Sequence, residues 1–321
     1  MQPSQTRLLS WTNYLLSHRV IAVVFTFIIS FVPFIGVLGI LLAALVTLKK
    51  GIVEGAIFTL AATLPYCFVR IAMPNSDAMT PLFIWLAIGI GSVSNLLTWV
   101  FAAMMRRKAD WSTILQTAAL TGVLVVSIVH LAYPDIAEWW FSQLQSFNAQ
   151  AHTVTEAIKN TANVDMEIDS VKEMQLQAMN TAKLIATGTV VGVTLLLGIW
   201  QLVLACWWNA AVYAPGSLQV GLHTIRLSTL AGALFLTSLV FSYLGNSVVL
   251  DIMPVLYLLF CAAGLSVLHY FFGMIKTPVV WFWLLLMYAT LLIAMPISLV
   301  VISTIALLDT WVNLRKKFKR V

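Results

Sequence analysis

Few residues in this sequence could carry chemistry, because ionisable and amide side chains are rare within its long apolar runs. Such groups are costly in hydrocarbon and usually face a bundle interior or a cavity. The best candidate is Asn95, which ends a small, polar stretch, 89–95, in the middle of an apolar run. It could line an opening between helices and contact a polar solute, or it could form a hydrogen bond between two helices.

Other polar residues lie near the ends of apolar runs. Glu54 could be a cavity carboxylate or a first-turn acid favoured by the helix macrodipole. His130, near the outer end of its run, and His269, near the inner end of its own, could relay protons or could be packed, hydrogen-bonded side chains. Asn209 lies where water can satisfy it, and Asp251 could cap the helix that follows it.

The sequence contains no motif for nucleotide, metal or covalent chemistry. It has no Gly-rich phosphate loop, no Cys and His cluster at metal-ligand spacing and no nucleophile motif. The three cysteines fall in apolar runs and are expected to be buried thiols. We therefore predict no catalytic residue, metal or cofactor. An intramembrane enzyme would need two convergent ionisable groups, and Glu54, His130 and His269 are expected at different depths.

The composition predicts an all-α, polytopic membrane protein. Of the 321 residues, 61% are hydrophobic and 9% are charged, and the mean hydropathy is +0.95. Soluble domains carry about 25% charged residues. The apolar runs are long enough for helices that span a bilayer and lack the alternation of a β-barrel. The first run is too long for a signal peptide and lacks a cleavage site, so the N-terminus is expected to be retained.

Eight hydrophobic runs are the predicted elements of a transmembrane helix bundle. They are Val20–Leu48, Gly51–Val69, Pro81–Met105, Ser112–Tyr133, Leu184–Val212, Leu227–Leu250, Ile252–Ile275 and Pro278–Leu308. The first and the last are longer than one span needs and are interrupted at Pro33 and Pro296. Tryptophans near the run ends are expected to anchor the protein at the membrane interface.

The basic residues favour one of two topologies. If every run crosses once, Lys49-Lys50 and 106–108 lie opposite the basic tail, 315–320. If the first and last runs each fold back on themselves, fourteen of the eighteen Lys and Arg share one side. Positive charge favours the cytoplasmic side, so we expect both termini in the cytoplasm. The net charge of +6 then reflects topology and not a nucleic-acid partner.

Residues 134–183 form the one long polar segment. It holds seven of the twelve acidic residues but only three of the eighteen Lys and Arg. Apolar residues such as Phe141, Leu144 and Phe147 recur at three- and four-residue steps, which predicts two amphipathic helices. We expect an extracytoplasmic helical hairpin here, between transmembrane blocks 1–133 and 184–321 of one integral membrane domain.

Two stretches of the C-terminal half carry a family resemblance. The first is ACWWNAAVYAPG at 205–216, followed by HTIRL at 223–227, and the second is LLDTWVNLR at 307–315. With GLSVLH at 264–269, they resemble the YybS-like family of bacterial membrane proteins, although Ser228 stands where that family is expected to have proline. The residues that the resemblance singles out are Trp208, Pro215, Gly216, Arg226, Asp309 and Arg315.

The YybS-like family is likened to the substrate-capture subunits of energy-coupling-factor transporters. This likeness implies a small-molecule cavity among the helices and an energising partner protein. Two features differ, because such subunits are usually shorter and lack a polar central hairpin. We predict a membrane component that binds or transports a small solute without its own ATPase. The alternative is a non-transporting interaction or assembly protein whose segment 134–183 recruits a partner.

Overall fold

The computed structural model describes residues 3–32, 34–72, 81–162, 168–275, 279–295 and 297–318. Every regular element in these ranges is an α-helix, which confirms the predicted all-α class. The N-terminal helices are α1 (Pro3–Ser17), α2 (Arg19–Ile29), α3 (Val37–Lys49), α4 (Ile52–Ala72), α5 (Pro81–Arg106) and α6 (Trp111–Ala132). Two helices from the polar segment follow, α7 (Ile136–Ala162) and α8 (Ile168–Ala182). The C-terminal helices are α9 (Ala186–Tyr213), α10 (Ser217–His223), α11 (Thr229–Tyr243), α12 (Ser247–Met274), α13 (Val280–Ile293), α14 (Ile297–Val312) and α15 (Leu314–Phe318).

Four of the described helices, α5, α6, α9 and α12, are long and apolar enough to cross a membrane. Each has between 22 and 28 residues, and a span needs about 20. Shorter apolar helices accompany them, namely α3, α4, α11, α13 and α14. This is the architecture of a membrane-embedded helical protein.

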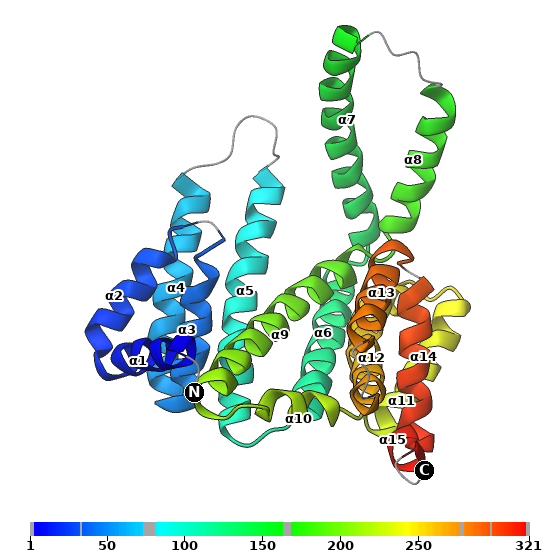
Figure 1. The fold of residues 1–321 in the computed structure, drawn as a ribbon. Coiled ribbons are helices and arrows are strands. Elements are labelled where there is room, and N and C mark those ends of the chain that lie inside the picture. Colours follow the sequence, from blue (N-terminus) through cyan, green and yellow to red (C-terminus); the bar gives the residue numbers. More distant parts are fainter. Residues whose placement is uncertain are drawn as a thin grey trace.

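The two interrupted runs each form a pair of short helices. The run 20–48 divides into α2 and α3, with 11 and 13 residues, and the run 278–308 divides into α13 and α14, with 14 and 16 residues. In each pair the second helix returns toward the end of the bundle from which the first one starts (Figure 1). At 1.5 Å per residue, none of them reaches the roughly 30 Å of a bilayer core. Pro33 and Pro296 themselves lie outside the described residues.

One predicted helix boundary is wrong. The run Leu227–Leu250 does not form a single span, because α11 ends at Tyr243 and Gly245 adopts a left-handed conformation with φ 80°. The Asn246 side chain then accepts a hydrogen bond from the Val249 nitrogen at 3.0 Å and caps α12. Asp251 therefore lies within α12 and does not cap it.

The long helix α9 crosses the bundle diagonally and joins its two halves (Figure 1). Its N-terminal half packs on α6 and α12, where Leu195 and Val191 approach Gly122 of α6. Its C-terminal half packs on α1, α3 and α5. A movement of α9 would therefore change packing contacts in both halves of the bundle.

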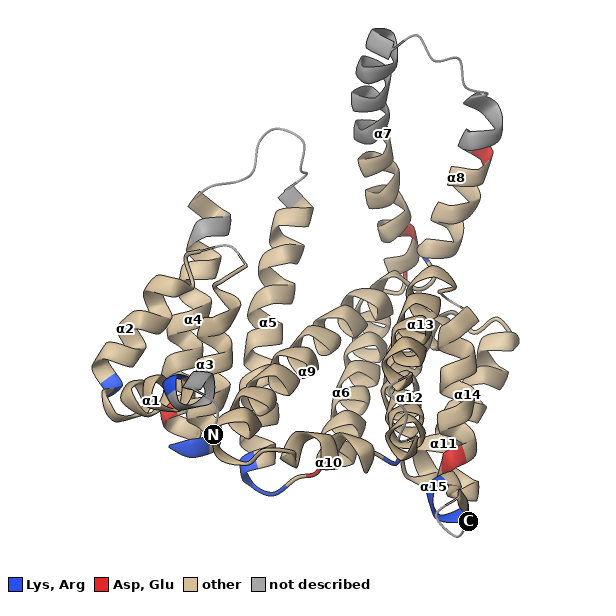
Figure 2. Cartoon of the chain, in the orientation of Figure 1, with Lys and Arg blue, Asp and Glu red and all other residues tan. Residues whose placement is uncertain are grey.

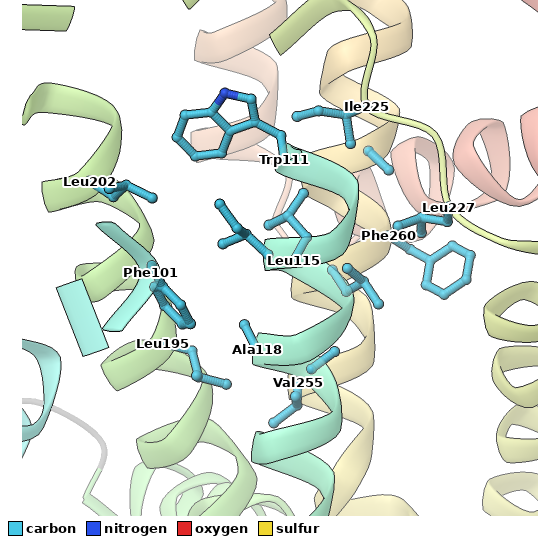
Figure 3. Close-up of a cluster of buried hydrophobic side chains, with 14 of the residues drawn as sticks. Phe101, Trp111, Leu115, Ala118, Leu195, Leu202, Ile225, Leu227, Val255 and Phe260 are labelled. Atoms are coloured by element: carbon cyan, nitrogen blue, oxygen red, sulfur yellow. The ribbon is translucent and has the colours of Figure 1, made fainter. Parts of the chain in front are cut away.

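A hydrophobic core surrounds this crossing. Phe101 of α5, Leu202 of α9 and Ile114 of α6 are almost fully buried, as are Val255 and Phe260 of α12. Figure 3 shows side chains of this cluster converging from α5, α6, α9 and α12, with Ile225 near Trp111 and Leu227 beside Phe260. The core thus holds together helices that are far apart in the sequence.

Helices α7 and α8 project from the end of the bundle where α6 ends and α9 begins (Figure 1). We call this end of the bundle the outer end and the opposite end the inner end, as names for positions in the fold alone. Their bases are tied to the bundle, because Lys183 pairs with Glu138 at 2.8 Å and the Trp140 indole donates to the Thr187 hydroxyl at 2.9 Å. The periodicity of the polar segment predicts a turn at 160–164, but α7 continues to Ala162, and residues 163–167 lie outside the described residues. Most of the described Lys and Arg lie at the opposite end of the bundle (Figure 2).

Candidate functional site

A chain of hydrogen-bonded polar side chains joins α4, α5 and α9 at the middle of their lengths. The Asn95 amide donates to the Thr63 hydroxyl at 3.1 Å, and the Gln201 amide donates to the Asn95 oxygen at 3.4 Å. The Thr98 hydroxyl donates to Gln201 Oε1 at one end of the chain. At the other end, the Thr63 hydroxyl donates to the Thr59 carbonyl at 2.8 Å. We call Thr63, Asn95, Thr98 and Gln201 the amide cluster.

Two residues of the amide cluster are buried and the other two are partly exposed. Thr98 is fully buried and Asn95 is 9% exposed, whereas Thr63 and Gln201 are only half-buried. None of the four side chains is ionisable. Each of the four side chains already has a hydrogen-bond partner, so the second amide hydrogen of Gln201 and the remaining oxygen lone pairs are the groups that can bind water or a solute.

Close helix packing explains why the sequence is small and polar near Asn95. A Cβ atom at Gly198 of α9 would lie 3.1 Å from Leu97 Cβ and 3.2 Å from the Ser94 carbonyl oxygen of α5. A Cβ at Gly91 would collide with the ring of Tyr66 on α4. The small residues therefore bring the three helices close enough for their polar side chains to meet.

A second polar group lies at the outer ends of α6, α9 and α12. Nε2 of His130 on α6 is 2.8 Å from Oδ2 of Asp251 on α12. The other carboxylate oxygen, Oδ1, accepts a hydrogen bond of 2.7 Å from the backbone nitrogen of Gly188 on α9. The His130 and Asp251 side chains are only 9% and 2% exposed. The Asp251 carboxylate, which belongs to α12, thus caps the N-terminus of the neighbouring helix α9. The sequence suggested instead that Asp251 caps the helix that follows it.

The remaining polar candidates lie apart from both groups. Glu54 is half-buried in the first turn of α4. His269 contacts the Leu265 carbonyl through Nδ1 at 2.8 Å and the Tyr288 hydroxyl through Nε2 at 3.0 Å, which fixes the imidazole between α12 and α13. The Asn209 side-chain oxygen is buried and accepts no hydrogen bond from the described residues.

Three of the residues singled out by the family resemblance meet at the inner end of the bundle. Arg226 donates to the Asp309 and Thr310 carbonyls at the end of α14, at 3.1 and 2.9 Å. Arg315, just beyond α14, donates in return to the His223 and Ile225 carbonyls at 2.7 and 2.6 Å. The two arginines therefore clasp the α10–α11 connection to the end of α14.

The carboxylate of Asp309 completes this arginine clasp. Its Oδ1 accepts a hydrogen bond of 2.9 Å from the Leu314 nitrogen, beside Asn313, which has a positive φ of 49°. Its Oδ2 lies 3.8 Å from Nε of Arg315. Burial lowers the pKa of the neighbouring His223, and His269 and Arg315 lower it further. The clasp is a structural feature that places α15.

The other residues of the resemblance shape the inner end of α9. The Trp208 indole donates to the Thr12 hydroxyl of α1 at 3.0 Å. Pro215 and Gly216 lie in the turn after α9, where Gly216 precedes α10 with a φ of 85°. Since a positive φ favours glycine, Gly216 permits the change of direction between α9 and α10.

Sequence reasoning identified Asn95 and His130 but not their partners. Gln201, Thr63 and Thr98 are isolated polar residues in separate apolar runs, and only the fold brings them together. The partner of His130 was missed because Asp251 was assigned to a helix end. The signal available in the sequence was that Asp251 is followed directly by an apolar run, as a carboxylate within a span would be.

Comparisons of the chain with protein-family models, with curated proteins and with solved structures find no match. The arguments on function below therefore rest on the geometry and chemistry of this chain.

Proposed function

We propose that this chain is an integral membrane component that binds a small solute at the amide cluster and takes part in its transport. The observation that carries the proposal is the partial exposure of Gln201 and Thr63 beside the buried Asn95, at the middle of three apolar helices. Intramembrane polar groups usually face a cavity or a partner. Here they converge from α4, α5 and α9, which is the convergence that a binding site requires.

The chemistry of the amide cluster favours a neutral, hydrogen-bonding solute. Asn95 and Gln201 each offer an amide donor and an amide acceptor, and Thr63 adds a hydroxyl. The bond from Asn95 to Thr63 has an ordinary length of 3.1 Å, whereas the bond from Gln201 to Asn95, at 3.4 Å, is longer than usual and is the one that a ligand would replace. A charged solute would find no counter-ion among these side chains.

This chain would not itself hydrolyse ATP to move the solute, because its sequence contains no Gly-rich phosphate loop. Energy would come from a partner protein or from an ion gradient. An energising partner is what the resemblance to the YybS-like family implies.

We also propose that the chain is not an enzyme. No described Ser, Thr or Cys side chain hydrogen-bonds to His130, so the His130–Asp251 pair has no nucleophile to activate there.

We propose that the end bearing the Lys and Arg residues faces the cytoplasm of a bacterium and that α7 and α8 lie outside the inner membrane. The charge distribution in Figure 2 and the bias of cytoplasmic loops toward positive charge support this orientation. Single cysteines at Lys50, Ser142 and Lys317, on a cysteine-free background, test it in intact cells. Only Ser142→Cys should react with a membrane-impermeant maleimide, and labelling of Lys50→Cys would contradict the folded-back first run.

A thermal-shift screen of neutral polar solutes against the purified protein in nanodiscs tests the binding site. At least one solute should raise Tm in the wild type and not in Asn95→Leu or Thr63→Val. The matched control is Thr121→Val, because the exposed Thr121 hydroxyl bonds only within α6, to the Thr117 carbonyl. A solute that stabilises all the variants equally binds elsewhere, and its behaviour would contradict this site.

The second candidate is an assembly protein that recruits a partner through α7 and α8. The observation that favours it is the exposure of large apolar side chains on these helices, including Phe147 at 44% and Met174 at 69%. Deletion of residues 141–180 separates the two functions. A solute-binding core should keep its thermal shift, whereas an assembly protein should lose a co-purifying partner.

A further inference from the structure

We propose that His130 and Asp251 form a proton-binding site that couples a proton gradient to the solute site. The use of the proton in transport rests on the proposed function, but the binding of the proton does not. The geometry that points to it is an imidazole and a carboxylate 2.8 Å apart, both more than nine-tenths buried, at the outer ends of two long apolar helices. Buried His and acidic residues of this kind are the components of proton relays in membrane proteins.

The pair is isolated from other ionisable groups. His130 is the one ionisable side chain of α6, and the first half of α12 contains Asp251 and, six residues further along, Tyr257. Neither α9 nor α14 contributes an ionisable group near this end, and α5 has its arginine at the opposite end. The described titratable groups around the outer end are Tyr133, Asp135, Glu138, Lys183 and Tyr243. Because Glu138 and Lys183 pair with each other, the local charge is set mainly by the buried pair.

The proton balance of the site is simple. With His130 neutral, its Nε2–H donates to Asp251 Oδ2 and the pair carries one negative charge. A proton taken from water binds Nδ1 and turns the imidazole into imidazolium, so that the pair becomes neutral overall. Release of the same proton to water restores the charge. The Nε2–H···Oδ2 bond is present in both states, so proton binding changes the charge of the site without breaking it.

The charge of the pair acts directly on α9. Oδ1 of Asp251 accepts the hydrogen bond from the Gly188 nitrogen in the first turn of α9, where the helix dipole favours a negative charge. When a proton binds His130 and makes the pair neutral overall, the attraction between the pair and the N-terminus of α9 becomes weaker. The same helix carries Gln201 of the amide cluster, about 20 Å further along at 1.5 Å per residue. A proton at His130 is thereby linked, through one rigid helix, to the side chain that contacts the solute.

Histidine side-chain NMR of the full chain, labelled with 15N-histidine in lipid nanodiscs, tests the site with protons as the only probe. Spectra are recorded from about pH 5 to pH 9; the five histidines give separate imidazole signals, and His130→Gln identifies the signal of His130, which should change its protonation state within the series. Asp251→Asn removes the carboxylate that lies 2.8 Å from the imidazole, so it should change the pH at which this signal changes. Asparagine keeps an acceptor for the Gly188 nitrogen, so this variant should remain folded.

The control is His269→Gln, which removes the signal of the other intramembrane histidine and should leave the His130 titration unchanged. The proposal is overturned if His130 keeps one protonation state across this range, or if Asp251→Asn leaves its proton affinity the same. No solute is needed, so failure of the solute screen would refute the proposed function without deciding the proton site.

Coupling is tested in proteoliposomes with the solute that stabilises the protein in the screen. Asp251→Asn should lose accumulation driven by a pH gradient but keep exchange of labelled solute at equilibrium. Asn95→Leu should lose both. Accumulation by Asp251→Asn at the wild-type level would overturn the coupling role.

Discussion

Gly188 and Asp251 hold the outer end of α9 against α12 at a distance that leaves no room for a side chain. The Gly188 nitrogen donates to the Asp251 carboxylate at 2.7 Å, and a Cβ at Gly188 would overlap the Asp251 carbonyl oxygen. Because the obstructing atom belongs to the backbone, the helices themselves would have to separate. We predict that Gly188→Ala lowers the free energy of unfolding by about 1–3 kcal/mol or more, measured as a fall in Tm in detergent.

The control for this prediction is one helical turn away. A Cβ at Gly192 would meet its nearest atom, in the Pro254 backbone, at 3.9 Å, which is an ordinary contact. Gly192→Ala should leave Tm nearly unchanged. If the two variants lose equal stability, close packing at Gly188 is not what holds α9 against α12.

Two neighbouring tryptophans in α9 should differ in their effect on α1. The Trp208 indole donates to Thr12 at 3.0 Å, whereas the Trp207 side chain is 59% exposed. Trp208→Phe keeps the ring and removes the donor, at a cost of about 0.5–1.5 kcal/mol. A change of about 1 kcal/mol alters an opening equilibrium roughly fivefold, so tryptic cleavage after Arg7 or Arg19 should accelerate by about that factor. Trp207→Phe should cleave at the wild-type rate, and acceleration in both variants would argue for general loosening instead.

The arginine clasp should not tolerate a lysine. Arg315 directs two nitrogens at different carbonyls, of His223 and Ile225, and the Nη2 atom that reaches Ile225 also contacts Ser266. The single ammonium of lysine cannot reproduce this fork. Arg315→Lys should lose at least one charged hydrogen bond, about 1.5–3 kcal/mol, and lower Tm. Lys317→Ala, at an exposed position of α15, serves as the control and should keep the wild-type Tm. A wild-type Tm for Arg315→Lys would show that the positive charge alone, and not the guanidinium fork, holds the clasp.

The helices could largely be predicted from the sequence, because apolar runs in a membrane protein have few alternatives to the helix. The positions of α4, α5, α6 and α9 agree with the predicted runs to within a few residues. The boundary between α11 and α12 was missed because Gly245-Asn246 interrupts a segment that is apolar on both sides. A left-handed glycine and an N-cap are local events with little effect on average hydropathy.

The site could be predicted only in part, since its residues come from different helices. Asn95 was identified because a small polar stretch is unusual within a span. Its partners Thr63 and Gln201 look like isolated polar residues until the diagonal path of α9 brings them to one level. The motif residues Arg226, Asp309 and Arg315 could be named from a resemblance, but nothing in their spacing indicates that they form a clasp.

The cap of α6 should make a pH-dependent contribution to stability. Asp110 accepts a hydrogen bond from the Thr113 nitrogen at 2.9 Å, and its hydrogen bonds to the side chain and backbone of Thr113 lower the pKa of Asp110 below its ordinary value of 3.8. A carboxyl group whose pKa is lower in the folded state stabilises the fold fully above the unfolded pKa. This stabilisation is lost as the pH falls through the lowered native pKa.

Asp110→Asn isolates this contribution, because asparagine is also a good N-cap but does not titrate. The wild type should be more stable than Asp110→Asn at pH 7, since a negative charge favours the helix N-terminus by about 0.3–1 kcal/mol. The difference in Tm between the two proteins should shrink as the pH is lowered from about 5 toward 3. Asp110→Ala should lose about 1 kcal/mol at pH 7. A difference between wild type and Asp110→Asn that stays constant, or grows, on acidification would show that the carboxylate of Asp110 does not stabilise α6 through its charge.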